Sequence, residues 1–101
     1  SADNFMNGRT NGVATYRNCE AGDGYADIVF KSKREDKAVI IEIKAASAGA
    51  DLITLSENAV AQIDRKNYAE PFVQSRMISS IYTYGIAFSG KNCFITCKKI
   101  K

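Results

Sequence analysis

The chain has 101 residues, 46% hydrophobic and 25% charged, which predicts one small soluble globular domain. Its formal net charge of +3 is compatible with nucleic-acid binding but does not require it. The sequence contains no histidine, which excludes Ser-His-Asp and Cys-His nucleophiles and histidine general bases. No apolar run is long enough to span a membrane and no signal-peptide pattern opens the chain, so we expect a cytoplasmic location without membrane contact.

The cysteines predict neither disulfides nor a metal centre. Their number is odd and their spacing irregular, and a zinc site would need a fourth ligand that histidine usually supplies. Cys93 and Cys97 would share one face of a strand. We therefore expect them to be small buried apolar residues.

The N-terminal part is rich in Asn, Gly and Thr, and we expect residues 1–17 to be a poorly defined segment, as a loop or a frayed helix. The Gly- and Asp-containing stretch 20–24 predicts a turn that opens the main domain, residues 18–101. Two strands, 25–31 and 38–46, follow on either side of a charged hairpin connection. Because the second strand is apolar on both faces, we expect it to be central and covered on both sides.

The C-terminal half predicts a helix followed by a second hairpin. Asp51 can cap a helix that continues to about Ala69, and Pro71 prevents it from extending much further. The remaining elements are expected in this order: a short helix over 76–81, a strand over 82–88, a tight turn over 89–92 and a strand over 93–100.

Two acids and a lysine lie inside the otherwise apolar strands of the first hairpin: Asp27, Glu42 and Lys44. A turn centred between residues 34 and 35 places Phe30 opposite Val39 and Asp27 opposite Glu42. Glu42 and Lys44 share a face because side chains of a strand alternate. A slip of one residue would separate the three side chains.

Two carboxylates that meet in this way repel each other unless a proton or a cation lies between them. Mg²⁺ or Mn²⁺ with oxygen ligands would satisfy both acids, and the backbone carbonyl of Ile43 is a further candidate ligand. Lys44 could then activate a water molecule or stabilise the charge of a pentacovalent phosphate. The alternative is structural: Asp27 and Glu42 are solvated and Lys44 is their cross-strand ion-pair partner.

The order of these residues resembles the PD-(D/E)xK nuclease pattern, in which Asp27 is followed by Glu42-Ile43-Lys44. Ala26 stands where that pattern has proline. Further segments are similar to the nuclease-like domain at the C-terminus of many predicted bacterial ATPases: residues 18–27, 40–44, 61–63, 66–68, 84–88 and 90–91.

The resemblance implies an α/β fold of the restriction-endonuclease type, with a mixed central sheet flanked by helices in αβββαβ order. It also implies that Glu20 completes the metal site and that Gln62, on the following helix, points back toward it. Two features depart from the family. The helix ahead of Glu20 is short or missing, so another chain could supply part of the covering layer, and no phosphate-binding loop of an ATPase is present.

The predicted function is hydrolysis of phosphodiester bonds by a metal-dependent nuclease, in DNA rather than RNA. The basic residues expected to bind nucleic acid are Lys33, Arg34, Arg65 and Lys66. The alternative is a catalytically inactive module of the same fold that binds nucleic acid or docks a partner ATPase, in cis or in trans. A homodimer that restores the missing helical layer is a third hypothesis.

Overall fold

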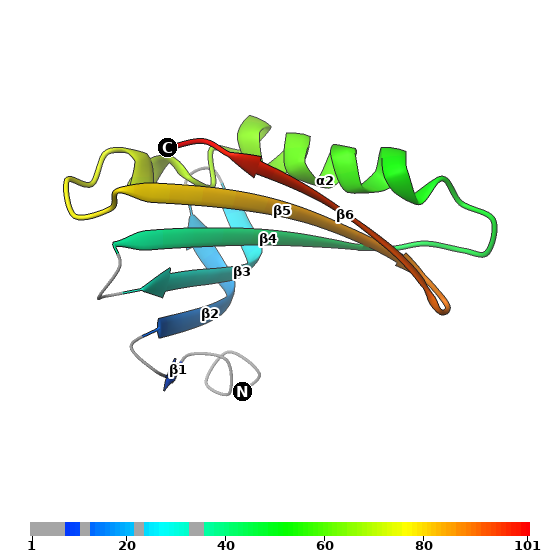
Figure 1. Ribbon diagram of the computed structural model, residues 1–101, viewed down its shortest axis with the longest axis horizontal. Coiled ribbons are helices and arrows are strands. Elements are labelled where there is room, and N and C mark those ends of the chain that lie inside the picture. Colours follow the sequence, from blue (N-terminus) through cyan, green and yellow to red (C-terminus); the bar gives the residue numbers. More distant parts are fainter. Residues whose placement is uncertain (1–7, 11–12, 22–23, 33–35) are drawn as a thin grey trace.

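The computed structural model describes residues 8–10, 13–21, 24–32 and 36–101, with side chains described from residue 36 onward. Its strands form one six-stranded sheet in the order of the chain (Figure 1). The strands are β1 (Gly8–Thr10), β2 (Val13–Ala21), β3 (Gly24–Ser32), β4 (Lys37–Ala45), β5 (Ser80–Ser89) and β6 (Asn92–Lys99). The helices are α2 (Leu52–Arg65) and the short α3 (Glu70–Val73).

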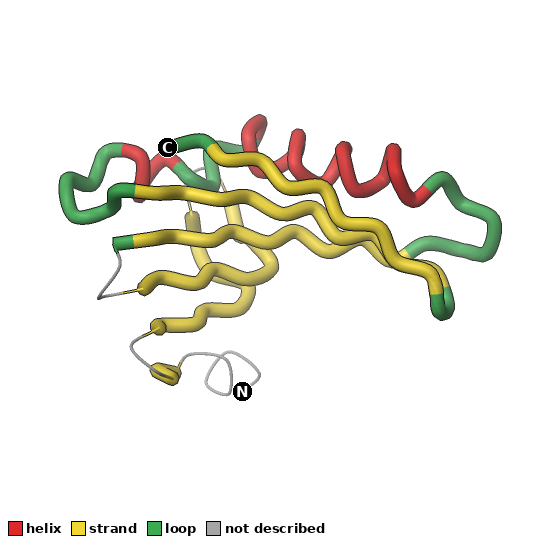
Figure 2. The backbone as a smooth tube through the Cα atoms, in the orientation of Figure 1, coloured by secondary structure: helices red, strands yellow, loops and turns green. Residues whose placement is uncertain are grey.

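The sheet is mixed because one connection differs from the rest. β4 and β5 are parallel, whereas every other neighbouring pair is antiparallel. Parallel neighbours need a crossover, and α2 with α3 provides it between β4 and β5 (Figure 2). The predicted α/β fold with a mixed central sheet is confirmed.

Helix α2 begins at the predicted cap. The Asp51 side chain accepts a hydrogen bond from the backbone N–H of Thr54 at 3.2 Å and another from its hydroxyl at 2.7 Å. Buried side chains then recur at helical spacing, from Ser56 through Ala59 and Val60 to Ile63. This stripe packs α2 onto one face of β4, β5 and β6.

Gly85 lets α2 approach β5 closely. A Cβ atom at this position would overlap the carbonyl oxygen of Ser56 and lie 2.9 Å from the Cβ of Ala59. Beyond this contact, the C-terminal end of α2 and the α3 region close a core over β4 and β5. Its buried residues are Ala38, Ile40, Ile63, Tyr68, Ala69, Ile78 and Ile81.

Several predicted elements were wrong in position or type. Residues 8–10 and 13–18 form strand rather than loop or helix, and Glu20 lies in β2 rather than in a turn. The main helix ends at Arg65, because Asn67 adopts a positive φ of 55°. The short helix is α3, with Pro71 in its first turn, whereas residues 76–79 contain no helix.

The two faces of β4, β5 and β6 differ in how they are covered. On the face beneath α2, Ile40, Thr83 and Ala87 are fully buried. On the other face, here called the open face, no residue of these strands is buried. The large apolar and thiol side chains of the open face are Val39, Ile41, Ile43, Tyr82, Tyr84, Ile86, Phe88, Cys93, Ile95 and Cys97, and the face also carries Lys37, Ala45, Ser80 and Lys99.

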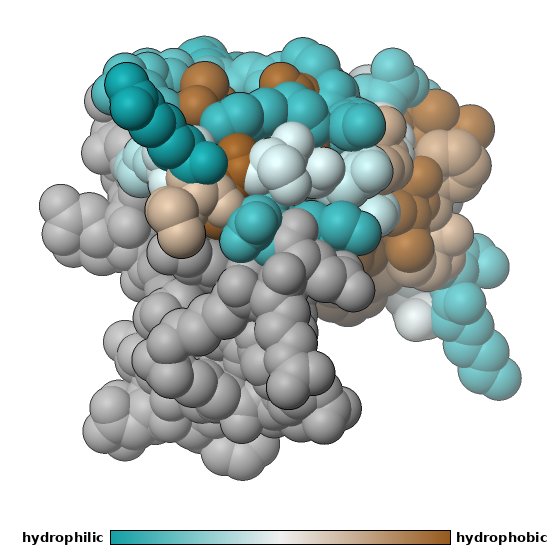
Figure 3. Space-filling view, turned by 60° about the vertical axis from the view of Figure 1, so that its left-hand side comes forward, coloured by the Kyte–Doolittle hydropathy of each residue, from teal (hydrophilic) through white to brown (hydrophobic). Residues whose placement is uncertain are grey.

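The open face corrects two predictions. β4 is central but not covered on both sides, since Ile43 is 37% exposed. Cys93 and Cys97 are exposed free thiols rather than buried residues, because their positions on β6 face away from α2. Figure 3 shows hydrophobic residues gathered along one side of the described surface, while hydrophilic residues cover its top.

Two pairs of described residues with polar groups cross the open face between β5 and β6. Lys99 Nζ lies 5.8 Å from the centroid of the Tyr82 ring. Tyr84 pairs with Cys97 in the β5–β6 register. A hydrogen bond with the Cys97 thiol, followed by the charge of that group, raises the pKa of the Tyr84 hydroxyl above its ordinary value of 10.0.

Candidate active site

The first hairpin has the register that the sequence predicted. Phe30 lies opposite Val39, and the pairing extends to Ile28 opposite Ile41. Asp27 and Glu42 are the next residue on each strand, one step beyond this last pair, and strand alternation puts both positions on the same face as Ile40. Continuing the observed register by one step would place positions 27 and 42, fifteen residues apart in the chain, opposite each other.

Position 20 belongs to the same face of the sheet. Glu20 pairs with Tyr25 in the β2–β3 register, and Tyr25 precedes Asp27 by two residues. The backbone positions of the three predicted acidic ligands therefore occupy neighbouring strands on one face of the sheet, the face that α2 covers over β4, β5 and β6. Positions 20 and 27 are placed by their backbone alone, because side chains are described from residue 36 onward.

Glu42 is a buried charged residue beneath α2, with 6% of its surface exposed. The Oε2 atom of this side chain makes no hydrogen bond to a described residue. Glu42 does have an interaction partner within the protein. Buried carboxylates usually carry compensating partners, because burial disfavours a lone charge. Hard divalent cations prefer such oxygen donors, so the donor chemistry fits the predicted metal.

Lys44 follows on the same face of β4 and contacts α2. Its Nζ donates a hydrogen bond to Oε1 of Gln62 at 2.5 Å, and the pair is partly buried. A charged donor makes this a strong hydrogen bond that restricts the lysine side chain. The structure thus joins Lys44 to Gln62, and alternation along β4 places Glu42 on the same face as Lys44.

A groove of about 400 Å³ opens beside this contact, between β4 and the flank of α2 that faces it. Its lining residues are Lys44, Leu55, Asn58, Ala61, Gln62 and Arg65. Asn58 was not singled out from the sequence. Its spacing of four residues from Gln62 could have revealed it, because such residues share one side of a helix.

The other predicted positions fall into three groups. Ile43 lies opposite Ile86 in the parallel register, and its role as a carbonyl ligand stays a prediction. Arg65 and Lys66 are exposed at the end of α2, whereas Lys33 and Arg34 lie outside the described residues. Across the described part of the chain, no three acidic or cysteine side chains converge to form a metal site.

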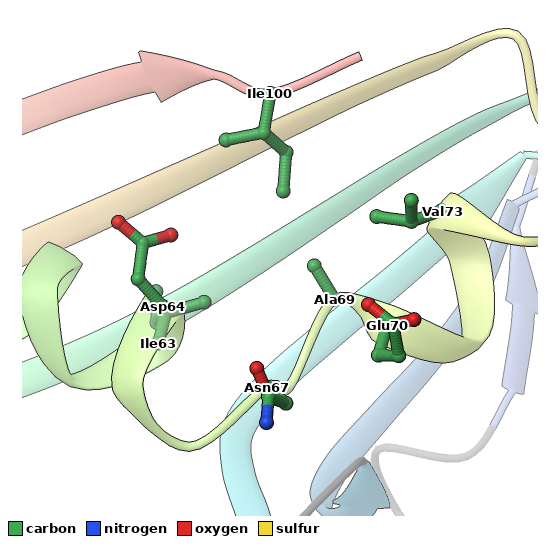
Figure 4. Close-up of a pocket in the computed structure, with 7 residues that line it drawn as sticks. All are labelled: Ile63, Asp64, Asn67, Ala69, Glu70, Val73 and Ile100. Carbon is green, nitrogen blue, oxygen red and sulfur yellow. The ribbon is translucent and has the colours of Figure 1, made fainter.

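A second hollow, of about 120 Å³, lies at the C-terminal end of α2 (Figure 4). The apolar side chains of Ala69, Val73 and Ile100 line it together with acidic residues on α2 and α3. One of these acids, Asp64, is paired with Lys98 at 2.7 Å. Lys98 is thus already paired with an acid of the hollow, and the lining itself contains two acids and no basic residue. This hollow therefore does not favour an anionic ligand.

Comparison with known proteins agrees with this geometry. The family model described as PD-(D/E)XK nuclease superfamily matches residues 8–98, which is most of the chain. The chain belongs to the PD-(D/E)XK nuclease superfamily. Proteins of this superfamily generally use divalent metals, and the family implies contact with nucleic acid.

One further match between this chain and a known protein covers a short stretch of sequence. A stretch of 20 residues is 90% identical to part of the outer membrane protein YedS of Escherichia coli, covering 20% of this chain and 6% of that protein. The match is too short to carry an argument, and no solved structure matches the chain. Within the described ranges, neither helix is long and apolar enough to cross a membrane.

Proposed function

We propose that this chain is a metal-dependent nuclease domain that hydrolyses phosphodiester bonds in DNA. The observation that carries the proposal is the hydrogen bond from Lys44 to Gln62 beside the buried Glu42. A lysine held in a fixed position next to a carboxylate suits a reaction in which negative charge develops on a phosphate. An ordinary surface lysine would instead be free to move and would need no buried neighbour.

In this proposal Asp27 and Glu42 hold a divalent cation, Mg²⁺ or Mn²⁺, with Glu20 and the carbonyl of Ile43 as further ligands. The bound cation would supply Lewis-acid assistance and lower the pKa of an attacking water molecule. Lys44 stabilises the charge that develops on the phosphate oxygens or orients the water. Gln62 acts through Lys44 and is therefore a positioning residue.

The proposal is tested by cleavage of plasmid and single-stranded DNA in the presence of Mg²⁺ or Mn²⁺. Glu42→Gln and Lys44→Ala should each reduce the cleavage rate by about a hundredfold or more. Glu57→Gln and Lys91→Ala are matched controls, because both residues are exposed and lie outside the groove. Cleavage that survives both site substitutions in folded protein would refute the assignment.

A second candidate function is supported by the open face. An exposed apolar surface of this kind favours docking of a partner, such as an ATPase domain or a second copy of the chain. In that case the nuclease fold would serve as an inactive binding module. Calorimetric titration separates the two functions, since an inactive module should not bind Mg²⁺ or Mn²⁺ at millimolar concentration.

A further inference from the structure

The two flanks of α2 differ in their polar contacts. On the flank toward β6, Ser56 and Thr96 hydroxyls lie 2.6 Å apart, and Asp64 accepts a hydrogen bond from Lys98 at 2.7 Å. Polar groups on this flank therefore satisfy one another. On the flank toward β4, the described side chains make one comparable contact, the hydrogen bond from Lys44 to Gln62.

The β4 flank lines the groove with residues at a regular spacing. Leu55, Asn58, Gln62 and Arg65 follow one another at intervals of three or four residues, so they form one stripe along the helix. The stripe continues past the Lys44 contact in both directions. Asn58 lies one turn before Gln62, and Arg65 lies one turn after it.

The groove is suited to an anion. Its lining includes two cationic residues, Lys44 and Arg65, and no carboxylate. The acids of α2, Glu57 and Asp64, are absent from the lining. Asn58 adds an amide that can donate hydrogen bonds, and Asn and Arg side chains commonly contact phosphate oxygens.

We propose that this groove holds the phosphodiester backbone of one nucleic-acid strand, which Asn58 and Arg65 bind on either side of the reacting phosphate. The inference rests on the proposed nuclease function, because that function places the reacting phosphate at Lys44. Residues one turn apart have Cβ atoms about 5–6 Å apart, comparable to the separation of successive phosphates in an extended strand. The strand would therefore run parallel to α2.

Binding can be measured without cleavage by fluorescence anisotropy of a labelled oligonucleotide in EDTA. Arg65→Ala and Asn58→Ala should each weaken binding severalfold, up to about tenfold for the arginine, the equivalent of one charge-assisted hydrogen bond. Arg65→Ala should also lower the slope of affinity against salt concentration by about one. Arg76→Ala and Asn92→Ala are matched controls, because these exposed residues lie outside the groove.

Binding is measured separately with single-stranded and with duplex DNA, because both contain the phosphodiester backbone. The comparison shows which of the two forms the groove binds. Unchanged affinity and salt slope in Arg65→Ala and Asn58→Ala would overturn the proposal. Weakened binding in both variants, without any cleavage by the wild type, would support the groove and refute the nuclease function. If cleavage needs Lys44 but both groove variants have the wild-type KM, the nuclease function would be supported and the groove proposal refuted.

Discussion

The two faces of β4, β5 and β6 distribute polar and apolar residues in opposite ways. Beneath α2, the strands carry Glu42, Lys44 and Thr83 among their small and aliphatic residues. On the open face, large apolar side chains remain accessible, with Phe88 40% and Ile95 52% exposed. The covered face thus contains a buried carboxylate, whereas the open face is mostly hydrophobic, with Lys37 and Lys99 near one end.

This difference between the two faces identifies the features of the sheet that need a functional explanation. A core that served stability alone would exclude a buried glutamate, because removing a charge from water is costly. An accessible apolar face is likewise costly unless something binds it. Each face therefore departs from the simplest packing, and each departure can be tested with substitutions on neighbouring residues of one strand.

The largest effect is expected at Gly85, where α2 contacts the covered face. Gly85→Val should reduce the free energy of unfolding by roughly 3 kcal/mol or more, because the side chain would overlap the α2 backbone. On the open side of the same strand, Ile86→Val should cost about 1 kcal/mol or less. Urea denaturation measures both, and similar values would contradict the difference between the faces.

A smaller effect is expected from Gln62, which holds Lys44 over the covered face. Gln62→Leu removes the acceptor of the 2.5 Å hydrogen bond and should reduce the DNA cleavage rate by about tenfold, through kcat rather than KM. Asp64→Asn on the β6 flank of the helix serves as the control. Equal rates for wild type and Gln62→Leu would show that Lys44 does not need this partner.

The N-cap of α2, the helix over the covered face, should stabilise the fold in a pH-dependent way. Hydrogen bonds from the Thr54 hydroxyl and then its backbone N–H keep the pKa of Asp51 below its ordinary value of 3.8. A carboxylate with a lowered folded-state pKa stabilises the fold above its unfolded pKa and loses this effect as pH falls through the folded value.

Asp51→Ala should therefore lower the Tm by a few degrees at neutral pH. The difference from wild type should shrink as pH falls below the ordinary pKa of 3.8, and its charge-dependent part should be lost below the folded-state pKa. Thermal melts followed by circular dichroism across this range provide the measurement. A constant difference at all pH values would show that the cap does not act through its charge.

The smallest effect on stability is expected on the open face. Ile95→Lys should change the free energy of unfolding by no more than about 0.5 kcal/mol, because this side chain is 52% exposed. It should nevertheless reduce binding of a hydrophobic dye and any concentration-dependent association seen by sedimentation. A large loss of stability would mean that this face is covered within the folded chain.

The sequence was most informative where short-range rules apply. Alternation along the strand put Glu42 and Lys44 on one face, and the Phe30–Val39 register followed from the length of the first hairpin connection. Asp51 was recognisable as a helix cap from its position before an apolar stripe. The ends of elements were less predictable, since the helix was expected to continue to Ala69 whereas Asn67 ends α2 with a positive φ, a conformation that asparagine tolerates.

Residue order and strand periodicity were sufficient to predict the superfamily, the mixed α/β class and the shared face of Glu42 and Lys44. The one-sided cover of β4 and the exposure of Cys93 and Cys97 could be read from the three-dimensional arrangement alone. The same arrangement also decided that Lys44 meets Gln62 and that Asn58 shares their groove. Such contacts depend on where α2 crosses the sheet, which the close approach at Gly85 sets.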